Sequence, residues 1–367
     1  MAKKINIVIS ASNISSGGPL TIFNYFLLSF NDRVNDFNII AFVNNKNHFP
    51  NYTNITFIEL KWYKKFIPLK FFYEYLYYYL YSKKNIIDLW ISLSDCNPNV
   101  IAKTRVSYFH NAIPSHSFSL IEIWYSLKLF FQKYYSKYFY KINIQKNKYI
   151  IVQQSWFREY ISKEFNYKIS NIIVFPPKYF VTKTNCNVKH ENKHTFVCPT
   201  KAVYYKNNEI ILNAFSKMDE NIREKSILYI TLNGRENRYI KKLYKKYGHL
   251  ENINWIGQLT FDKMKSIYAK SNTLIFLSKL ESWGLPLTEA ATFDLNIIAP
   301  NLPYAYETIS GYEKVLFINP DDLNNLKETI LSFILNKKVD FNEKKINLIK
   351  EPFVQSFDDC INYIKTN

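Results

Sequence analysis

The chain has 367 residues, of which 47% are hydrophobic and 21% charged, and its formal net charge is +18. This length exceeds what one hydrophobic core usually organises, and the composition excludes a disordered chain. The charge suits nucleic acid, anionic lipid or a phosphorylated substrate, because each is densely negative. All but 6 of the 48 basic residues are Lys, so an AT-rich coding background is an equal explanation for part of the charge.

The cysteines are scattered along the chain, at Cys96, Cys186, Cys198 and Cys360. Without a close pair they indicate neither a zinc site nor a disulfide framework, and they fit a reducing cytosol. The chain begins MAKKINIVIS, whose apolar stretch of about six residues is too short for the core of a secretory signal. We therefore expect a cytoplasmic protein.

Short β-branched and aromatic runs alternate with segments long enough for helices, which predicts parallel α/β units in two doubly wound sheets. In the first half, the expected strands are 5–10, 37–43, 87–93, 104–110 and 148–154. In the second half, they are 195–200, 226–234, 253–257, 273–279, 295–300 and 315–320.

A stretch with a Pro pair and many polar residues, 176–194, interrupts this pattern as a linker would. A run of apolar residues at helical spacing predicts a last helix near the end of the chain. The expected organisation is an N-terminal domain over 1–178, a linker over 179–194, a C-terminal domain over 195–349 and a final helix over 350–367.

The loop after strand 5–10 carries Gly17 and Gly18 directly before an apolar segment that we interpret as a helix. Glycines there let backbone N–H groups approach a phosphate or a sugar at a helix N-terminus. A Gly pair at such a turn is more often only a tight turn, and the full dinucleotide fingerprint is missing.

The most specific segment is LESWGLPLTEAATFDLNIIAP, residues 280–300. Glu281 follows an apolar strand and Glu289 comes eight residues later. Between them, Gly284 and Pro286 mark a turn and the start of a helix, because Pro is favoured in a first helical turn. Glu281 is therefore expected in the loop, and Glu289 about one turn into the helix.

The free N–H groups of this turn form an anion pocket between the two carboxylates, and they belong to Trp283, Gly284 and Leu285. A carboxylate also binds ribose or hexose hydroxyls through charge-assisted hydrogen bonds. The segment resembles the signature of retaining glycosyltransferase family 4, two glutamates separated by seven residues with a Gly-Leu-Pro-like turn and a Glu-Ala helix. The alternative is a pair of solvated glutamates near a helix start.

The segment TFVCPTKAVYYKNNEIILNAF, residues 195–215, resembles the start of the family's C-terminal domain. Where the family usually has Arg, then Lys five residues later and Gly, this chain has Lys201, Lys206 and Asn207. Both lysines supply positive charge for a diphosphate, but Lys cannot reproduce the bidentate fork of Arg. At Asp294 the family commonly has Gly.

His110 lies at the end of an expected strand, and so at the edge of an open α/β sheet where ligands bind. Family members often have a His here that reaches the transferred sugar. A packing or hydrogen-bonding role is the alternative. The other five histidines show no metal-ligand spacing, so we expect no metal and no other cofactor.

Two aromatic, Lys-rich stretches cover residues 61–84 and 121–148, and each contains six Lys and one Glu. Neither has about 20 uninterrupted apolar residues, which disfavours a membrane-spanning helix. Basic aromatic helices that lie on an anionic membrane surface fit better. Core helices with a Tyr-rich composition are the alternative.

The resemblance implies a GT-B fold, an α/β architecture of two Rossmann-like, doubly wound domains that face each other across a cleft. It implies a retaining glycosyltransferase with a UDP- or GDP-linked sugar as donor and a final helix that crosses back to the first domain. The residues carried over are Lys206 and Lys201 for the diphosphate, Glu289 for the ribose, Glu281 for the donor sugar, and His110 for the same sugar. Fixed positive charge can stabilise such a leaving group without a metal.

These features together indicate bacterial surface polysaccharide assembly, of O-antigen, lipopolysaccharide or capsule, on a lipid-linked saccharide at the inner face of the cytoplasmic membrane. Two other classes stay open. A non-catalytic nucleotide-sugar-binding relative is suggested by Lys201 and Asp294. A nucleic-acid-binding protein is suggested by the charge alone, and no nucleic-acid motif supports it.

Overall fold

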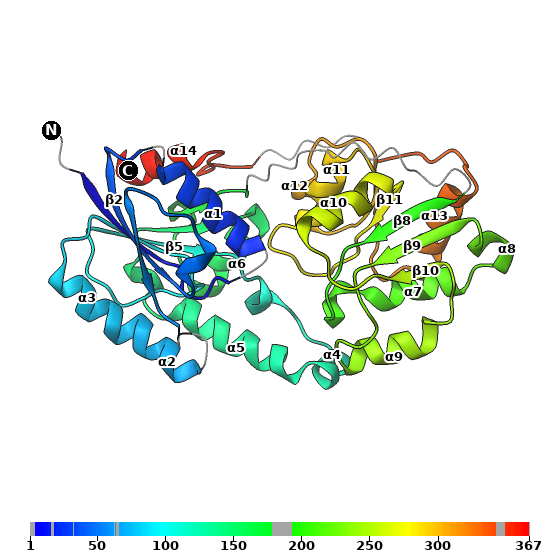
Figure 1. The fold of residues 1–367 in the computed structure, drawn as a ribbon, viewed down its shortest axis with the longest axis horizontal. Coiled ribbons are helices and arrows are strands. Elements are labelled where there is room, and N and C mark those ends of the chain that lie inside the picture. Colours follow the sequence, from blue (N-terminus) through cyan, green and yellow to red (C-terminus); the bar gives the residue numbers. More distant parts are fainter. Residues whose placement is uncertain are drawn as a thin grey trace. The chain divides into compact units, whose positions relative to one another are not determined.

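The computed structural model describes residues 4–15, 18–31, 33–61, 63, 66–177, 193–342 and 349–366. The chain forms two compact units, each built on a parallel sheet (Figure 1). Unit 1 comprises Met1–His116, Phe131–Lys178 and Ile349–Asn367, and unit 2 comprises Ser117–Phe130 and Tyr179–Leu348.

The sheet of unit 1 has seven parallel strands in the order β3-β2-β1-β4-β5-β6-β7. The strands are β1 (Ile5–Ser10), β2 (Phe37–Val43), β3 (Ile55–Glu59), β4 (Leu89–Ser92), β5 (Thr104–Phe109), β6 (Tyr149–Val152) and β7 (Ile172–Val174). Five of them were predicted from the sequence, and β3 and β7 were not. Both additional strands are short and lie at the two edges of the sheet, where little apolar periodicity is needed.

Helices cover both faces of this sheet, as a parallel sheet requires. They are α1 (Gly18–Asn31), α2 (Ile67–Phe71), the π-helical η2 (Phe72–Tyr77), α3 (Tyr78–Lys84), α5 (Leu127–Lys141), α6 (Ser155–Phe165) and α14 (Phe357–Thr366). Single 3₁₀ turns are η1 (Lys46–His48), η3 (Ile113–Ser115), η4 (Ile144–Lys146) and η5 (Ile169–Asn171). Along β1, Ile7 and Ile9 pack on the side of α1 and α14, whereas Val8 packs with Tyr78 of α3.

The last helix, α14, is part of the core of unit 1. The ring of Phe357 lies 4.8 Å from that of Phe26 and 4.4 Å from that of Phe30, between centroids, and both partners belong to α1. Ile361 and Ile364 are buried in the same cluster. The two ends of the described chain therefore fold into one hydrophobic core.

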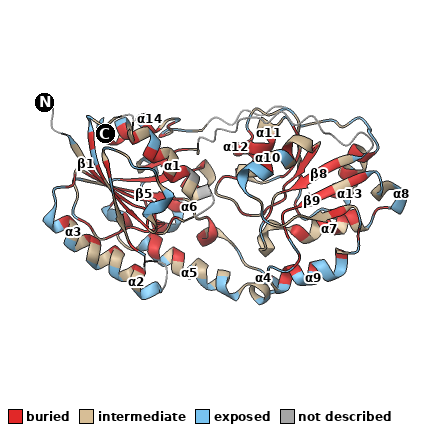
Figure 2. Cartoon of the chain, in the orientation of Figure 1, coloured by how far each residue is buried: buried red, intermediate tan, exposed pale blue. Residues whose placement is uncertain are grey.

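The sheet of unit 2 has six parallel strands in the order β10-β9-β8-β11-β12-β13. They are β8 (His194–Cys198), β9 (Ser226–Ile230), β10 (Ile253–Trp255), β11 (Thr273–Ile275), β12 (Asn296–Pro300) and β13 (Val315–Ile318), one for each predicted strand. Around them lie α4 (Leu120–Tyr125), η6 (Tyr204–Lys206), α7 (Asn208–Ser216), α8 (Glu220–Arg223), α9 (Arg238–Tyr247), α10 (Phe261–Lys270), α11 (Leu285–Thr292), α12 (Pro303–Thr308) and α13 (Leu323–Ile334). Figure 2 shows that the strands of both sheets are largely buried.

The division of the chain differs from the predicted one at Ser117–Phe130, which the prediction placed in the N-terminal domain and which belongs to unit 2. The physical reason is aromatic packing, because Tyr125 of α4 contacts Tyr204 and Tyr239 of unit 2. His194, predicted as the end of the linker, is the first residue of β8. The linker residues 179–192 lie outside the described part of the chain.

Candidate functional site

In unit 2, the strand order reverses between β8 and β11, which is the place where open α/β sheets bind ligands at their carboxyl ends. The chain leaving β8 carries Lys206 at the end of η6, and the chain leaving β11 carries Glu281. The Lys206 ammonium forms an ion pair with Glu281 Oε1, and the two side chains are only 12% and 16% exposed. The structure thus brings together two residues that the sequence placed 75 positions apart.

The turn that carries Lys206 is fixed by a buried polar network at the ends of β8 and β9. The Thr200 N–H donates to Thr231 Oγ1 at 2.7 Å, and the Thr200 hydroxyl donates to Asn208 Oδ1 at 2.7 Å. Gln258 Nε2 donates to the carbonyls of Thr200 and Thr231 at 3.0 and 2.6 Å. Sequence reasoning missed these positioning residues, and the available signal was a polar residue within three positions of a strand end at Thr200, Thr231 and Gln258.

Lys201 belongs to the same turn but is exposed, unlike Lys206. Its carbonyl accepts hydrogen bonds from Asn208 Nδ2 at 3.1 Å and from the Val203 N–H at 2.8 Å. Its backbone is therefore fixed while its ammonium reaches solvent. The two lysines predicted to act together therefore differ, because the Lys206 side chain is paired and largely buried whereas Lys201 is exposed.

Two positions where the family commonly has Gly adopt a left-handed backbone in this chain. Asn207 has φ of 59° and Asp294 has φ of 60°, a region that Asn and Asp tolerate better than other non-Gly residues. Asn207 Nδ2 also donates to the Pro320 carbonyl at 2.6 Å, and Asp294 pairs with Lys314 at 2.6 Å. Both departures from the family pattern are thus accommodated by the local backbone.

The second glutamate, Glu289, lies inside α11 and is buried, at 8% exposure. The Tyr268 hydroxyl donates to Glu289 Oε2 at 2.6 Å, which fixes the carboxylate. Gly284 precedes the helix with φ of 95°, and a Cβ there would lie 3.3 Å from side-chain atoms of Leu287 and Tyr304. The turn between the two glutamates therefore needs glycine for conformation and for space.

The residues predicted to form the anion pocket occupy the first turn of this helix. Trp283 and Gly284 precede α11, and Leu285 is its first residue. The Trp283 indole N–H donates to Thr288 Oγ1 at 3.0 Å, and the Thr308 hydroxyl donates to the Trp283 carbonyl. These bonds fix the turn whose N–H groups have no partner within a helix.

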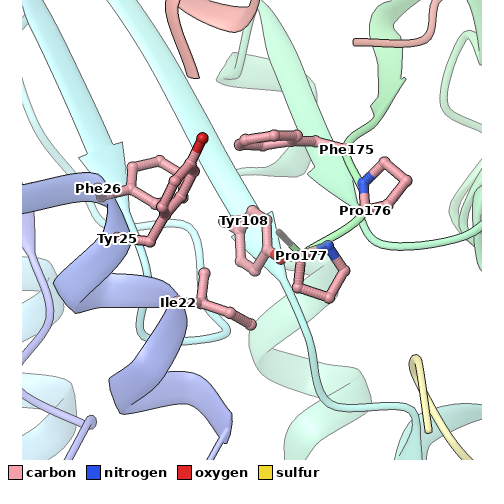
Figure 3. A pocket seen from close by; sticks show the side chains of 7 residues that line it. All are labelled: Ile22, Tyr25, Phe26, Tyr108, Phe175, Pro176 and Pro177. Atoms are coloured by element: carbon pink, nitrogen blue, oxygen red, sulfur yellow. The ribbon is translucent and has the colours of Figure 1, made fainter. Parts of the chain in front are cut away.

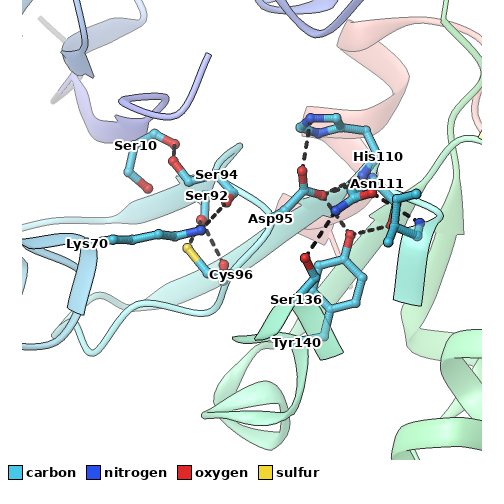
Figure 4. Close-up of polar contacts among 11 residues, drawn as sticks. Ser10, Lys70, Ser92, Ser94, Asp95, Cys96, His110, Asn111, Ser136 and Tyr140 are labelled. Atoms are coloured by element: carbon cyan, nitrogen blue, oxygen red, sulfur yellow. Dashed lines mark hydrogen bonds and ion pairs between the residues drawn. The ribbon is translucent and has the colours of Figure 1, made fainter. Parts of the chain in front are cut away.

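In unit 1, the chain leaving β4 carries Asp95 and the chain leaving the neighbouring β5 carries His110. His110 Nε2 lies 3.0 Å from Asp95 Oδ2 (Figure 4). Asp95 Oδ1 accepts from the N–H groups of His110 and Asn111 at 2.9 and 3.1 Å, and from the Tyr140 hydroxyl at 2.8 Å. The carboxylate therefore holds both the ring and the backbone of His110.

The environment of Asp95 keeps this carboxylate ionised. Burial alone would raise the pKa of Asp95, but the charge of His110 and hydrogen bonds from His110 and Tyr140 outweigh it, so the pKa is lowered. Sequence reasoning found His110 and missed Asp95. The available signal was an acidic residue just after the strand that precedes the His-bearing strand.

The loop that holds Asp95 is anchored by a buried cation. Lys70 of α2 is 7% exposed, and its ammonium lies 3.4 Å from the Ser94 carbonyl (Figure 4). The same ammonium lies 4.3 Å from the centre of the Phe139 ring. The neighbouring Glu74 is fully buried and accepts a hydrogen bond from Tyr63. Burial raises the pKa of Glu74, against the opposing effect of Lys70.

Of the predicted glycine pair, Gly17 lies outside the described residues, and Gly18 begins α1. Nearby, a hollow lies between α1 and the segment after β7, with aromatic walls (Figure 3). Its lining residues are Ile22, Tyr25, Phe26, Tyr108, Phe175, Pro176 and Pro177. Its free volume of about 10 Å³ holds one water molecule and no sugar.

A larger hollow of about 370 Å³ lies at the amino ends of β1, β4 and β5, bordered by α14. Asp95 and His110 lie at the opposite, carboxyl ends of the strands.

Within the described ranges, no three His, Cys, Asp or Glu side chains gather to hold a metal ion. In the same part of the chain, no helix combines the length and the apolar character needed to cross a bilayer.

Comparison with known proteins finds a family match in the second half of the chain. Residues 182–350 match the family described as glycosyl transferases group 1. The O-antigen chain mannosyltransferase RfbU of Salmonella typhimurium is 24% identical over 204 residues, 55% of each chain. The serotype-specific mannosyltransferase WbdA of Escherichia coli is 32% identical over 74 residues, 19% of this chain and 9% of WbdA. The chain thus spans about half of one relative and a small part of the other.

Solved structures extend the likeness to both units. WaaG, a glycosyltransferase involved in lipopolysaccharide biosynthesis, superposes with a TM-score of 0.66 at 11% identity, over 90% of each chain. Anabaena Alr3699/HepE, solved in complex with UDP and glucose, gives a TM-score of 0.60 at 12% identity, also over 90% of each chain. At these identities the likeness shows the fold. The fold, two parallel-sheet α/β units, matches that of GT-B glycosyltransferase structures, as expected from the sequence.

Proposed function

We propose that this chain, whose residues 182–350 form a group 1 glycosyl transferase domain, transfers a sugar from a nucleoside diphosphate sugar to a saccharide acceptor. The observation that carries the proposal is the largely buried pair of Lys206 and Glu281, at the point where the strand order of the unit 2 sheet reverses, with Glu289 one helical turn beyond the adjoining loop. These groups lie at the carboxyl ends of the strands. The cation suits the negative charges of a diphosphate, and the two carboxylates suit the hydroxyls of two sugars.

Each charged group has a separate task in this proposal. Lys206 stabilises the diphosphate as it leaves, with Lys201 and the N–H groups before α11 as further sources of positive charge. Glu281 accepts hydrogen bonds from the transferred sugar, and Glu289 from the ribose. Because Lys206 and Glu281 pair with each other, each is held near its working position before the donor binds.

We assign His110 to the transferred sugar, with Asp95 as the group that orients its ring. The contact of His110 Nε2 with Asp95 Oδ2, at 3.0 Å, fixes the orientation of the ring. In this proposal the acceptor attacks from the face on which the diphosphate departs, so the anomeric configuration is retained without a covalent intermediate on the protein. The leaving group is stabilised by fixed protein charge, and no metal is required in this scheme.

The biological setting of the proposal comes from the names of the relatives. Two matched proteins are O-antigen and serotype-specific mannosyltransferases, and one structural neighbour is involved in lipopolysaccharide biosynthesis. We therefore propose a lipid-linked saccharide of a bacterial surface polysaccharide as acceptor, at the cytoplasmic face of the membrane. Mannose is the first sugar to test, carried by GDP or UDP.

Exposed apolar side chains support membrane binding. On η2 and α3, Phe72, Leu76 and Leu80 recur every four residues and are 45–47% exposed. On α5, the exposed apolar residues follow a single stripe, Leu127, Phe131, Tyr134 and Tyr138. Lys70 and Glu74, which the prediction counted within the basic surface, are buried and take no part in it. The proposed membrane surface consists of these stripes and the exposed lysines beside them.

The two alternatives gain no support from the site. Asn207 and Asp294 fit their backbone positions, and Lys206 is paired and partly buried, so the departures from the family pattern leave the proposed chemistry possible. Among the described aromatic rings of the basic stretches, Phe139 packs within unit 1 and Tyr125 within unit 2, and others form the apolar stripes, so their positions are explained without stacked bases.

The test is release of nucleoside diphosphate by the purified protein with a panel of GDP- and UDP-linked sugars and a lipid-linked saccharide fraction. We expect turnover with one donor, unchanged by EDTA, and an anomeric configuration in the product equal to that in the donor. Donor binding without turnover under all conditions would favour the non-catalytic relative. A strict requirement for added divalent metal would contradict the proposed role of Lys206.

A further inference from the structure

The short helix α4 packs on unit 2 through an aromatic side chain whose function is not explained by the donor site. The ring of Tyr125 lies 6.3 Å from that of Tyr204, at an interplanar angle of 15°, and 5.2 Å from that of Tyr239, between centroids. Tyr204 and Tyr239 are themselves 5.2 Å apart. The three rings form one cluster, in which Tyr204 contacts both others.

Tyr204 belongs to the turn that carries the donor-site lysine. The turn η6 consists of Tyr204, Tyr205 and Lys206. The Tyr205 carbonyl accepts a hydrogen bond from the Lys279 N–H at 2.7 Å, and Lys206 pairs with Glu281. Only Tyr205 separates Tyr204 from Lys206. We therefore expect a displacement of Tyr204 to move the Lys206 ammonium relative to the Glu281 carboxylate.

A second side chain of α4 confirms how closely this helix approaches the turn. Glu122 is 3% exposed and its N–H is capped by the Ser119 hydroxyl at 3.2 Å. Burial and nearby carboxylates, Glu122 among them, raise the pKa of both Tyr204 and Tyr205. The inner side of α4 thus supplies one aromatic ring and one carboxylate to the surroundings of η6.

We infer that Tyr125 is a positioning residue for Lys206, because its ring holds Tyr204 and the turn η6 where the ammonium meets Glu281 and the donor diphosphate. The inference rests on the proposed function, since it concerns the same lysine. It also gives a reason for the path of the chain, which leaves unit 1 after His116 and returns to it at Phe131. In this inference, residues 117–130 join unit 2 because their ring at Tyr125 supports η6, the turn that carries Lys206.

The test compares three substitutions at Tyr125. Tyr125→Ala removes the ring and should lower kcat roughly tenfold, with a smaller change in donor KM, since misplacement of a charged group costs mainly transition-state stabilisation. Tyr125→Phe keeps the stacking ring and should stay within about twofold of the wild type. Tyr125→Leu keeps apolar volume without the ring, so it should resemble Tyr125→Ala and serves if the smaller residue prevents folding.

A matched control is Tyr244→Ala. Tyr244 lies on the same helix as Tyr239 and packs edge-on against Trp255, at 5.1 Å between centroids. Tyr244→Ala removes a comparable aromatic contact in unit 2, one that does not involve a residue of η6. Wild-type kcat is expected for this variant, and an equal loss in both variants would mean that general stability, and not positioning, explains the effect.

A double substitution distinguishes positioning from an independent structural role. If Tyr125 acts through Lys206, then Tyr125→Ala in the Lys206→Ala background should lower kcat by less than about twofold further, because residues that act as a unit are not additive. A full additive loss would overturn the inference. Wild-type turnover of Tyr125→Ala beside an impaired Lys206→Ala would overturn it while leaving the proposed site intact. Wild-type turnover of Lys206→Ala would overturn both.

Discussion

The ion pair of Lys206 and Glu281 joins loops that leave two neighbouring strands. In the proposed transfer the leaving diphosphate gains negative charge while the sugar becomes cationic, so we expect both side chains to bind the transition state more strongly than the ground state. We predict that Glu281→Gln and Lys206→Ala each lower kcat by roughly 10²-fold, the scale seen when one preorganised electrostatic contact is lost. Nucleoside diphosphate release measures this in variants whose circular dichroism matches the wild type.

Lys279 provides the control for that pair. It lies two residues before Glu281 and pairs with Asp321, but the carboxylate is 69% exposed. Exposed ion pairs contribute little, so Lys279→Ala should keep turnover within about twofold. If all three variants lose activity alike, or if Glu281→Gln and Lys206→Ala both turn over normally, the assignment of the site is wrong.

Glu289 should affect binding more than chemistry. Its carboxylate is fixed by the Tyr268 hydroxyl and is proposed to hold the ribose, which binds ground and transition states alike. We predict that Glu289→Gln raises the donor KM roughly tenfold with little change in kcat, and that Tyr268→Phe does the same to a smaller extent. Steady-state kinetics at varied donor concentration decide this. A fall in kcat at unchanged KM would place Glu289 at the reacting centre instead.

His194 gives the stability of unit 2 a pH dependence. Burial lowers the pKa of His194 to about 4, whereas in an unfolded chain a His titrates near 6.5. Between these values the unfolded chain binds more protons, so the free energy of unfolding falls as the pH decreases from about 6.5 to about 4. The His194→Gln variant should lose part of this acid sensitivity. Urea unfolding at about pH 7.5 and about pH 5 measures it, and identical pH dependence in both proteins would refute the prediction.

At the site, the sequence predicted the residues that carry a recognisable spacing and missed those that act by packing. Glu281, Glu289 and Lys206 stand in a pattern of charged residues around a turn, and the structure brings Lys206 and Glu281 together, while their roles in the chemistry stay a prediction. Asp95 and Tyr125 contact partners that are distant in the sequence, which are His110 after the neighbouring strand and the rings of Tyr204 and Tyr239. Hydrophobic periodicity in the sequence does not predict such contacts.

At the scale of helices and strands, hydrophobic periodicity predicted eleven strands and missed the two edge strands, β3 and β7. Within the basic stretch 61–84, residues 67–84 form a nearly continuous helix, α2 to α3, but its π-helical middle could not be predicted from residue type. In that region Lys70 and Glu74 are buried, so two charges expected at the surface belong to the core.

The exposed stripes of these helices predict membrane binding. Each basic residue near an anionic surface contributes about 1 kcal/mol, and exposed apolar side chains add to it when they enter the interface. We predict that Lys83→Glu with Lys84→Glu lowers the partition coefficient into anionic vesicles by more than about tenfold. Substituting Leu76 and Leu80 by Ser should also weaken binding, without the same dependence on salt. Vesicle co-sedimentation at several salt concentrations measures both effects.

Charge reversal elsewhere is the control for that experiment. Lys245 and Lys246 end α9 in unit 2, where the proposed surface does not extend. Their reversal changes the net charge by the same amount and should weaken vesicle binding much less. Equal losses from both pairs would mean that the net charge of +18 attracts the chain to lipid without a defined surface.

At the scale of the whole molecule, two segments fold away from their neighbours in sequence. The resemblance to known glycosyltransferases implied that the last helix joins the first unit, and α14 does so through Phe357, Ile361 and Ile364. The excursion of residues 117–130 into unit 2 was not predictable, because α4 has no pattern that marks its partner. A domain limit predicted from linker composition divides the chain at one point. The hydrophobic cores instead include segments from both sides of that point, because they are formed by side-chain contacts.

This arrangement predicts that a substitution near the end of the chain destabilises its beginning. Phe357 packs on Phe26 and Phe30, so Phe357→Ala should lower the free energy of unfolding of unit 1 by about 3–5 kcal/mol, the usual cost of removing a buried Phe. Hydrogen exchange resolved by peptide should show faster exchange in β1 and β2 and unchanged protection in β8 and β9. Phe333→Ala, in the core of unit 2, should give the reverse pattern. If Phe357→Ala changes exchange only within α14, the helix is attached to unit 1 without stabilising it.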